Sequence, residues 1–537
     1  MKKTLSLLTA LAMLLVLMPT FAIAEEAAEE PIVITAFMDG DPTLDYSQNY
    51  SLQYLEEKTG VRIDPTGYVF SNQEAPTQKQ LLLASGDYPE IFLANTEGAA
   101  FTFSEISTYG MQEGMLIPLN DLIASAPRLT ELFEQRPEYY DMHVAPDGNI
   151  YSICRFSECG HCRAANKIYV NMEWLEKLGL EIPTTTEEFY EMLKAFKEQD
   201  PNGNGQADEI PLSGVESWTG GFLNAFLEID DYNEKYVADI DGQIVFQANT
   251  EEFREALRYL NKLYTEGLVD PAAFTQEGTQ FSQTVGNDPT LVGAFTGAIY
   301  SVDMQNAYVY ENYRAIEPLK GPEGVQYAST NMFINMNLNG FFEITDKCEN
   351  PEAAIRWIDA AMQPEASIVR YYGAEGHGWQ YAEEGQQNIL GGEYVWEFLP
   401  TPESGAYTNE TFSLGPILGL KEFRAQWSPM ADDERLYSDS TIFEARIESE
   451  TENLYAPYLI SPVPNTFFLE GDETSRYNDL KTTIGEYVTM SIAQFVTGAK
   501  SLDGDWDQYL SDLEAYGVDQ YVELLQKGYD SVYGEDE

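Results

Sequence analysis

The segment Thr185–Glu209 reads TTEEFYEMLKAFKEQDPNGNGQADE and contains a capped amphipathic helix followed by a polar loop. The Thr185 hydroxyl and the Glu188 carboxylate have the spacing of a capping box, in which each side chain accepts a hydrogen bond from a free backbone amide. Apolar residues then recur at i, i+3, i+4 and i+7: Phe189, Met192, Leu193 and Phe196. This spacing predicts a helix with one buried face.

Short apolar strands and amphipathic helices alternate on both sides of this segment. The predicted strands are Ile32–Phe37, Val61–Ile63 and Ile91–Leu93. The predicted helices are Tyr50–Thr59, Gln78–Ala84 and Phe253–Tyr264. Gly60 and Gly267 follow two of these helices, where a left-handed residue commonly ends a helix. The alternation predicts α/β architecture with largely parallel sheets.

Composition narrows the class of protein. The chain has 537 residues, 44% of them hydrophobic and 13% aromatic, which predicts a globular protein with more than one domain or lobe. The formal charge of −59 argues against nucleic acid and anionic membranes, since both attract basic surfaces. We therefore expect no nucleic-acid partner.

The N-terminus has the three parts of a secretory signal peptide. A basic start at residues 1–3 precedes the apolar run Leu5–Met18, and Ala22-Ile23-Ala24 matches a small-x-small cleavage site. The apolar run is shorter than the roughly 20 residues of a membrane span. We expect cleavage after Ala24 and export, with residues 25–30 as an acidic spacer.

The loop after the capped helix has the ligand spacing of a calcium site. Oxygen-bearing side chains stand at positions 1, 3, 5 and 9: Asp200, Asn202, Asn204 and Asp208. Gly205 at position 6 permits a sharp turn, and calcium prefers 6–8 oxygen ligands. Position 12, a carboxylate in EF-hands, is Pro211 here, so Glu209 is the substitute. The alternative is an ordinary polar turn rich in Asp, Asn and Gly.

The cysteines allow three interpretations. The chain has four of them: Cys154, Cys159, Cys162 and Cys348. In an exported chain a disulfide is favoured. A zinc site using the three clustered thiolates is the second interpretation, although adjacent His161 and Cys162 are awkward joint ligands. The third is a thiol oxidoreductase motif in Cys-Gly-His-Cys, but that motif requires a thioredoxin-like strand followed by a helix.

Several runs of sequence, in order along most of the chain, carry a family resemblance. They include NMEWLEKLGLEIP at 171–183, DPNGNGQADEIP at 200–211, YLEEKTGV at 54–61, LASGDYPEI at 83–91, GMLIPLN at 114–120, DGNIY at 147–151, PLKGPEG at 318–324 and ENPEAAIRW at 349–357. The combination resembles family 1 extracellular solute-binding proteins, in particular the large members of the LplA and alginate-binding types.

The resemblance implies two α/β lobes joined by hinge strands, with a ligand in the cleft between them. One lobe would comprise about 31–165 plus about 330–430, and the other about 166–329 plus about 431–537. It also implies a monomer that delivers an oligosaccharide or glycoside to the permease of an ABC transporter. In the alginate-binding relatives the same loop binds structural calcium. The implied ligands here are Asp200, Asn202, Asn204, the Gln206 carbonyl, Asp208 and Glu209.

Substrate-binding residues are harder to identify. Sugars present apolar faces to aromatic rings and hydroxyls to polar side chains. The candidates lie in loop-like surroundings or in a stretch resembling a family motif: Trp218, Tyr371, Glu375, His377, Trp379 and Trp427. The alternative for each aromatic residue is a half-buried surface position.

Two other classes of function compete with solute binding. A secreted, calcium-braced glycoside hydrolase would need two carboxylates flanking the scissile bond, and 89 acidic residues make such a pair impossible to exclude by counting. A lectin would typically show repeated β-rich modules, which the α/β pattern disfavours. No HExxH or GxSxG motif occurs, so we expect a binding protein and no enzyme.

Many relatives carry a lipid-anchored cysteine just after the signal. None lies near residue 24, which leaves extracellular, cell-surface and periplasmic locations open.

Overall fold

The computed structural model describes most of the chain. The described residues are 30–164, 166–215, 218–231, 234–297, 302, 306–330, 339–399, 415, 418–464, 467, 469 and 473–533. The predicted signal peptide, and residues 25–29 of the predicted spacer, lie outside them. Among the described residues, none of the helices has the length and apolar character that crossing a membrane requires.

Five strands form the first sheet: β1 (Ile32–Asp39), β2 (Val61–Asp64), β3 (Val69–Phe70), β4 (Ile91–Leu93) and β12 (Phe342–Ile344). β2, β3 and β4 each pair with β1 in parallel, and β12 pairs with β4 antiparallel. The helices α2 (Tyr50–Thr59) and α3 (Ala75–Ser85) lie between these strands in the chain. The three predicted strands are confirmed, and β1 extends two residues further, to Asp39.

The second sheet contains four strands: β6 (Lys167–Asn171), β7 (Ile210–Gly214), β10 (Val292–Gly297) and β11 (Tyr313–Ala315). Their order is β11-β6-β10-β7. β10 and β7 are parallel, but β6 runs antiparallel to both β10 and β11. The prediction of α/β architecture is therefore confirmed. The prediction of largely parallel sheets holds for the first sheet and is wrong for the second, because β6 enters it in the opposite direction.

The capped helix is α9 (Thr186–Glu198), and its capping box at Thr185 and Glu188 is present. Its predicted apolar face is buried: Phe189, Met192, Leu193 and Phe196. The predicted helix at Gln78–Ala84 is longer in the structure, because α3 begins at Ala75 and Pro76 is accommodated in its first turn. The predicted C-terminal glycine of α2, Gly60, has a φ of 68°.

Further helices surround the sheets. Around and between the strands lie α4 (Phe103–Glu105), α5 (Asn120–Ile123), α6 (Pro127–Gln135), α7 (Pro137–His143), α8 (Met172–Leu178), α10 (Gly220–Leu223), α11 (Glu251–Thr265), α12 (Gly278–Val285), α13 (Ala307–Asn312), α14 (Pro351–Ala361) and α15 (Pro364–Tyr372). Later in the chain come α16 (Lys421–Ala425), α17 (Asp433–Leu436), α18 (Phe443–Glu450), α19 (Glu473–Thr497), α20 (Trp506–Tyr516) and α21 (Val518–Tyr533). Three short pairs of strands complete the fold: β5 (Phe156–Ser157) with β15 (Leu418–Gly419), β8 (Val237–Ile240) with β9 (Gln243–Phe246), and β13 (Trp379–Tyr381) with β14 (Trp396–Phe398).

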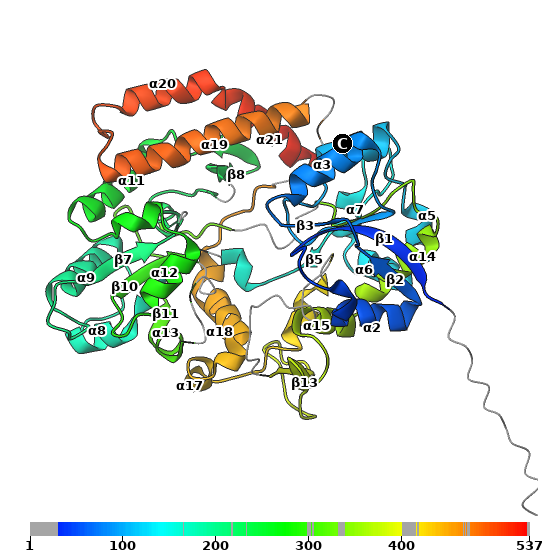
Figure 1. Ribbon diagram of the computed structural model, residues 1–537. Coiled ribbons are helices and arrows are strands. Elements are labelled where there is room, and N and C mark those ends of the chain that lie inside the picture. The colour runs from blue at the N-terminus through cyan, green and yellow to red at the C-terminus, as the bar shows by residue number, and fades with distance from the viewer. Residues whose placement is uncertain are drawn as a thin grey trace, which may run out of the picture.

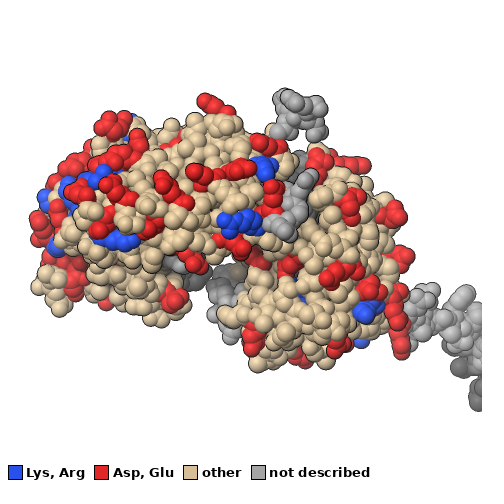
Figure 2. Space-filling view, turned by 90° about the horizontal axis from the view of Figure 1, so that it is seen from above, with Lys and Arg blue, Asp and Glu red and all other residues tan. Residues whose placement is uncertain are grey.

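The sheets belong to two bodies that lie side by side in Figure 1 and, seen from above, in Figure 2. Buried residues of the first body come from 34–156 and 341–427. The main core of the second body comes from 168–319 and 463–525, and includes residues of α19, α20 and α21. α18 lies between the two bodies in Figure 1. The chain therefore passes from one body to the other several times.

Candidate functional site

The carboxyl end of the first sheet carries a group of hydrogen-bonded polar side chains. We call this group the first polar edge: Asp39, Asn95, Thr96, Glu97 and Arg155. Asp39 is the last residue of β1, and Asn95 lies two positions after the end of β4. Because ligands of open α/β sheets bind outside the carboxyl ends of parallel strands, this edge is a candidate binding surface.

The Asp39 carboxylate, which has no exposed surface, holds the loop after β4 in place. It accepts hydrogen bonds from the Asn95 amide at 2.6 Å, the Thr96 amide at 3.0 Å and the Thr96 hydroxyl at 2.7 Å. Burial raises the pKa of Asp39, and these hydrogen bonds oppose that rise. Asp39 therefore positions its neighbours and is itself shielded from a ligand.

Arg155 supplies the positive charge of the first polar edge. Its guanidinium lies 3.4 Å from the Glu97 carboxylate, bonds the Asn95 carbonyl and stacks 4.1 Å from the Phe341 ring centre. The Arg155 Nε atom is shielded from solvent and has no hydrogen-bond partner among the described residues. A buried donor left without a partner costs about 1–3 kcal/mol, so an oxygen that reached Nε after a conformational change would be stabilised.

A smaller group of polar residues lies beyond the carboxyl end of β7. We call this group the second polar edge: Asn166, Gly220, Asp231 and Ser329. A Cβ atom at Gly220 would overlap the Asp231 carboxylate and approach the Asn166 amide, so a larger residue would displace these side chains. Burial raises the pKa of Asp231 to about 6, while a hydrogen bond with Ser329 lowers it. The Asp231 Oδ1 atom lacks a hydrogen-bond partner in the described part of the chain.

Both polar edges lie at ends of the connections between the two bodies. The chain leaves the first edge at Arg155 and reaches the second at Asn166, and it later runs from Ser329 to Asn339. The Asn339 amide donates to the Glu97 carboxylate at 3.3 Å. Both polar edges therefore lie where the chain crosses from one body to the other.

The structure buries the three tryptophans considered as sugar-binding groups. Trp218, Trp379 and Trp427 are 1%, 2% and 3% exposed. The Trp218 ring packs against Phe222 and Phe274, with ring centres 6.1 and 5.3 Å away. An indole covered by neighbouring side chains cannot stack on a sugar in this conformation. The structure therefore does not support these three residues as stacking platforms, and their apolar packing is the reason.

The remaining substrate candidates lie near α15. Tyr371 is half-buried, with its ring centre 5.9 Å from that of Trp427. Glu375 and His377 are exposed in the turn before β13. Trp218 belongs to the second body, so the six candidates are not brought together. These candidates were chosen for their aromatic and polar side chains. The first polar edge was not predicted, although the sequence contains polar residues shortly after two of the predicted strands.

The predicted calcium loop is folded by its own polar groups. The Asn204 side-chain amide donates to both oxygens of Asp208, at 3.0 and 3.1 Å. The Gly205 amide donates to Asp200 at 3.0 Å, and Gly205 has a φ of 75°. Asn202 Oδ1 accepts a hydrogen bond of 2.9 Å from the Asn204 amide. The predicted ligand side chains therefore lie around one loop. The same hydrogen bonds are also compatible with an ordinary polar turn, which is the alternative interpretation.

Glu209 distinguishes this loop from an ordinary polar turn. Its Oε1 atom is shielded from solvent and accepts no hydrogen bond from the described residues. Burial and the nearby carboxylates of Asp200 and Asp208 raise the pKa of Glu209. An orphaned carboxylate oxygen beside two further carboxylates is a donor set that a hard cation such as calcium would satisfy. The residues present therefore fit the implied ion.

Two of the four cysteines form a disulfide. Cys159 and Cys162 are bridged, with an S–S distance of 2.11 Å, and the predicted bridge is present. Cys154 and Cys348 are free thiols, and burial raises the pKa of Cys348 to about 11. The bridged loop follows the two-residue strand β5 and leads into a short 3₁₀ turn at His161–Ala164. This is not the strand-then-helix setting of a thiol oxidoreductase.

A family profile and two related proteins place the chain in the same family. The profile of the family described as bacterial extracellular solute-binding protein matches residues 40–368. The fructooligosaccharide ABC transporter substrate-binding protein FusA of Streptococcus pneumoniae is 30% identical over 508 residues, which cover 90% of this chain and 87% of FusA. Lipoprotein LipO of Bacillus subtilis is 25% identical over 89% of this chain and 86% of its own length.

Solved structures agree with these relatives. FusA in complex with kestose has a TM-score of 0.74 and 25% identity, and the match covers 93% of this chain and 99% of that one. An EF-hand mutant of FusA in complex with fructo-nystose also gives a TM-score of 0.74, with 26% identity and the same coverage.

Proposed function

This chain belongs to the family of bacterial extracellular solute-binding proteins, and from that premise we propose that it captures an oligosaccharide for an ABC importer. The observation that carries the proposal is the 30% identity to FusA over 90% of the chain. The family consists of binding proteins, which agrees with the expectation that the chain is not an enzyme.

We propose that the ligand lies between the two polar edges. Sugar hydroxyls both donate and accept hydrogen bonds, and the edges offer both kinds of partner. Arg155 Nε is a shielded donor without a partner, and Asp231 Oδ1 is the corresponding acceptor in the described part of the second body. Because FusA is named for fructo-oligosaccharides, these sugars are the first ligands to test.

The two bodies correspond in this proposal to two lobes that close on the ligand. We assign about 31–165 plus about 330–430 to one lobe and about 166–329 plus about 431–537 to the other. The described connection at 156–164 would then act as a hinge. Hinge closure of this kind takes place over microseconds to milliseconds. The closed complex, a monomer, would dock on the transporter's permease outside the cell membrane.

We propose that the loop Asp200–Glu209 binds a structural calcium ion. Its ligands would be Asp200, Asn202, Asn204, the Gln206 carbonyl, Asp208 and Glu209. Two observations support this assignment: the orphaned Glu209 oxygen, and the EF-hand named for the related FusA. When bound, the ion would neutralise the clustered carboxylates and brace the turn between α9 and β7.

A thermal-shift screen tests both parts of the proposal. The protein is heated with a panel of fructo-oligosaccharides, pectic fragments and N-glycans, in calcium and in EDTA. We expect at least one sugar to raise the melting temperature and EDTA to lower it. Chromatography of the recovered sugar then separates binding from hydrolysis, since a binding protein returns its ligand intact. Cleavage of the sugar would support the glycoside hydrolase alternative.

A further inference from the structure

The bridged loop Cys159-Gly160-His161-Cys162 has a feature that a structural disulfide does not require. The ligand atoms of Cys159, His161 and Cys162 all lie within 4.8 Å of one another. The Cys159 sulfur lies 3.3 Å from His161 Nε2. The sequence alone made adjacent His161 and Cys162 seem poor joint ligands, but the 3₁₀ turn at His161–Ala164 brings both toward Cys159.

The histidine ring also has the outer contact typical of a metal ligand. His161 Nδ1 lies 3.5 Å from the Glu444 carboxylate, and Arg424 holds that carboxylate at 2.8 Å. Histidines that bind metal usually donate their second ring nitrogen to a carboxylate or carbonyl, which fixes the ring orientation. His161 Nδ1 thus faces Glu444, while both ring nitrogens lie within 3.5 Å of the Cys159 sulfur and Nε2 is the nearer.

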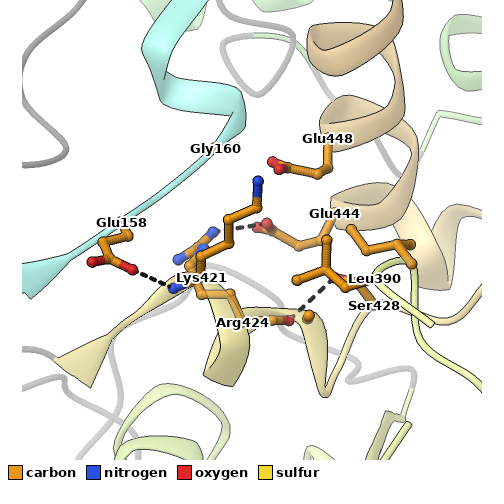
Figure 3. Close-up of a pocket in the computed structure, with 10 residues that line it drawn as sticks. Glu158, Gly160, Leu390, Lys421, Arg424, Ser428, Glu444 and Glu448 are labelled. Carbon is orange, nitrogen blue, oxygen red and sulfur yellow. Dashed lines mark hydrogen bonds and ion pairs between the residues drawn. The ribbon is translucent and has the colours of Figure 1, made fainter. Parts of the chain in front are cut away.

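Acidic residues of α18 approach the loop closely. Figure 3 shows Glu444 and Glu448 extending from α18 toward the segment that contains Gly160. A Cβ atom at Gly160 would overlap the Glu448 carboxylate, so glycine is required for this approach. Lys421 and Arg424 line the same small pocket from α16. The surroundings therefore contain both signs of charge, with the carboxylates on the α18 side.

We propose that Cys159, His161 and Cys162, once the disulfide is reduced, form a site for a thiophilic divalent cation such as Zn²⁺. Two thiolates and an imidazole are ligands that zinc prefers, and a tetrahedral site separates its ligand atoms by about 3.5 Å. The His161 ring nitrogens already lie near the Cys159 sulfur, and breaking the bridge frees the two sulfurs to move apart to this separation. The bridge and the metal site exclude each other, because a disulfide sulfur is not a thiolate. The inference is independent of the solute-binding function.

The reaction has two balanced steps. A dithiol reductant supplies two electrons and two protons, the Cys159–Cys162 bond breaks into two thiols, and the reductant closes into its own disulfide. Zn²⁺ then displaces the two thiol protons to solvent, forms two Zn–S bonds and accepts the lone pair of one His161 nitrogen. Reoxidation would expel the metal.

Cobalt provides a direct test, because thiolate ligation gives Co²⁺ a sulfur-to-metal charge-transfer absorption. The protein, saturated with Ca²⁺ to occupy carboxylate sites, is reduced with a phosphine, desalted anaerobically and titrated with Co²⁺. Thiol titration verifies reduction, since four thiols replace the two of the bridged form. If the native bridge resists the reductant, the protein is reduced in guanidinium and refolded, with circular dichroism as the check.

We expect the reduced protein to bind one Co²⁺ with a thiolate band that Zn²⁺ removes, and the bridged protein to show no band. Cys162→Ser should lose the band, and Cys348→Ser, which removes a thiol outside the cluster, should retain it. His161→Ala should weaken Co²⁺ binding by at least tenfold. Absence of the band in folded protein with four free thiols would overturn the proposal, as would an unchanged band in Cys162→Ser.

Discussion

The Arg155 guanidinium lies 3.4 Å from the Glu97 carboxylate and joins the carboxyl end of the first sheet to the start of a connection between the two bodies. Arg155 also bonds the Asn95 carbonyl, so the contact fixes both the loop after β4 and the crossing segment. Its Nε atom still lacks a partner among the residues described. We therefore propose Arg155 as the residue of the first polar edge that binds a ligand.

Arg155→Ala should weaken oligosaccharide binding by about tenfold to a hundredfold, since a hydrogen bond to a charged group contributes about 1.5–3 kcal/mol. Titration calorimetry measures the change. Arg62→Ala is the matched control, because Arg62 is an exposed guanidinium that pairs with Glu56 at 2.7 Å, away from the polar edges. Equal affinity in Arg155→Ala and the wild type would remove the first polar edge from the binding site.

Asp231 should make the protein less stable as pH rises from about 4 to 6. Burial raises the pKa of Asp231 from 3.8 to about 6 in the folded state, so the folded protein binds more protons across this window than the unfolded chain. Stability then falls as pH rises, by at most about 3 kcal/mol. Asp231→Asn should flatten this part of the curve of melting temperature against pH and raise the melting temperature at pH 7.5. It should also weaken ligand binding. A curve identical to the wild type would show that Asp231 ionises normally.

Calcium should stabilise the protein through Glu209. At a free concentration one hundred times the dissociation constant, the bound ion adds about 2.7 kcal/mol to the free energy of unfolding. Glu209→Gln should abolish most of the calcium-dependent rise in melting temperature. Glu198→Gln, an exposed position at the end of α9, should retain it. If metal analysis of the wild type finds no calcium and EDTA leaves its melting temperature unchanged, the loop is only a polar turn.

Breaking a buried ion pair should strongly destabilise the second body. Lys235 Nζ lies 2.6 Å from the Asp230 carboxylate, and neither side chain has exposed surface. Lys235→Met removes the cation that pairs with the buried Asp230 carboxylate, which costs about 3–5 kcal/mol. Lys527→Met removes an exposed pair with Glu473, and its effect should stay below about 1 kcal/mol. Urea unfolding compares the two variants, and equal midpoints would contradict the expected difference.

Local sequence patterns predicted much of the fold. The capping box at Thr185, the apolar face of α9 and the glycine after α2 were visible because each depends on residues within a few positions of one another. The direction of β6 was not predictable in this way, since strand pairing depends on residues far apart in the chain. Likewise, the burial of Trp218 arises from its packing against Phe222 and Phe274.

In the candidate site, too, local features were predictable from the sequence and tertiary contacts were not. The proposed calcium loop is a local feature, so its spacing alone singled out the candidate ligands. The first polar edge combines Asp39, Asn95 and Arg155, which the parallel pairing of β1 with β4 and the later return of the chain bring together. Their types were visible in the sequence, but their proximity depends on tertiary structure.

Calorimetric titration of kestose and related oligosaccharides into the calcium-loaded protein, with chromatography of the sugar afterwards, tests the central claim most directly. We predict saturable binding of one sugar per chain, loss of affinity in Arg155→Ala, and recovery of the sugar intact. Failure of every oligosaccharide in the panel to bind, or release of cleaved sugar, would contradict the assignment of this chain as an oligosaccharide-capturing protein.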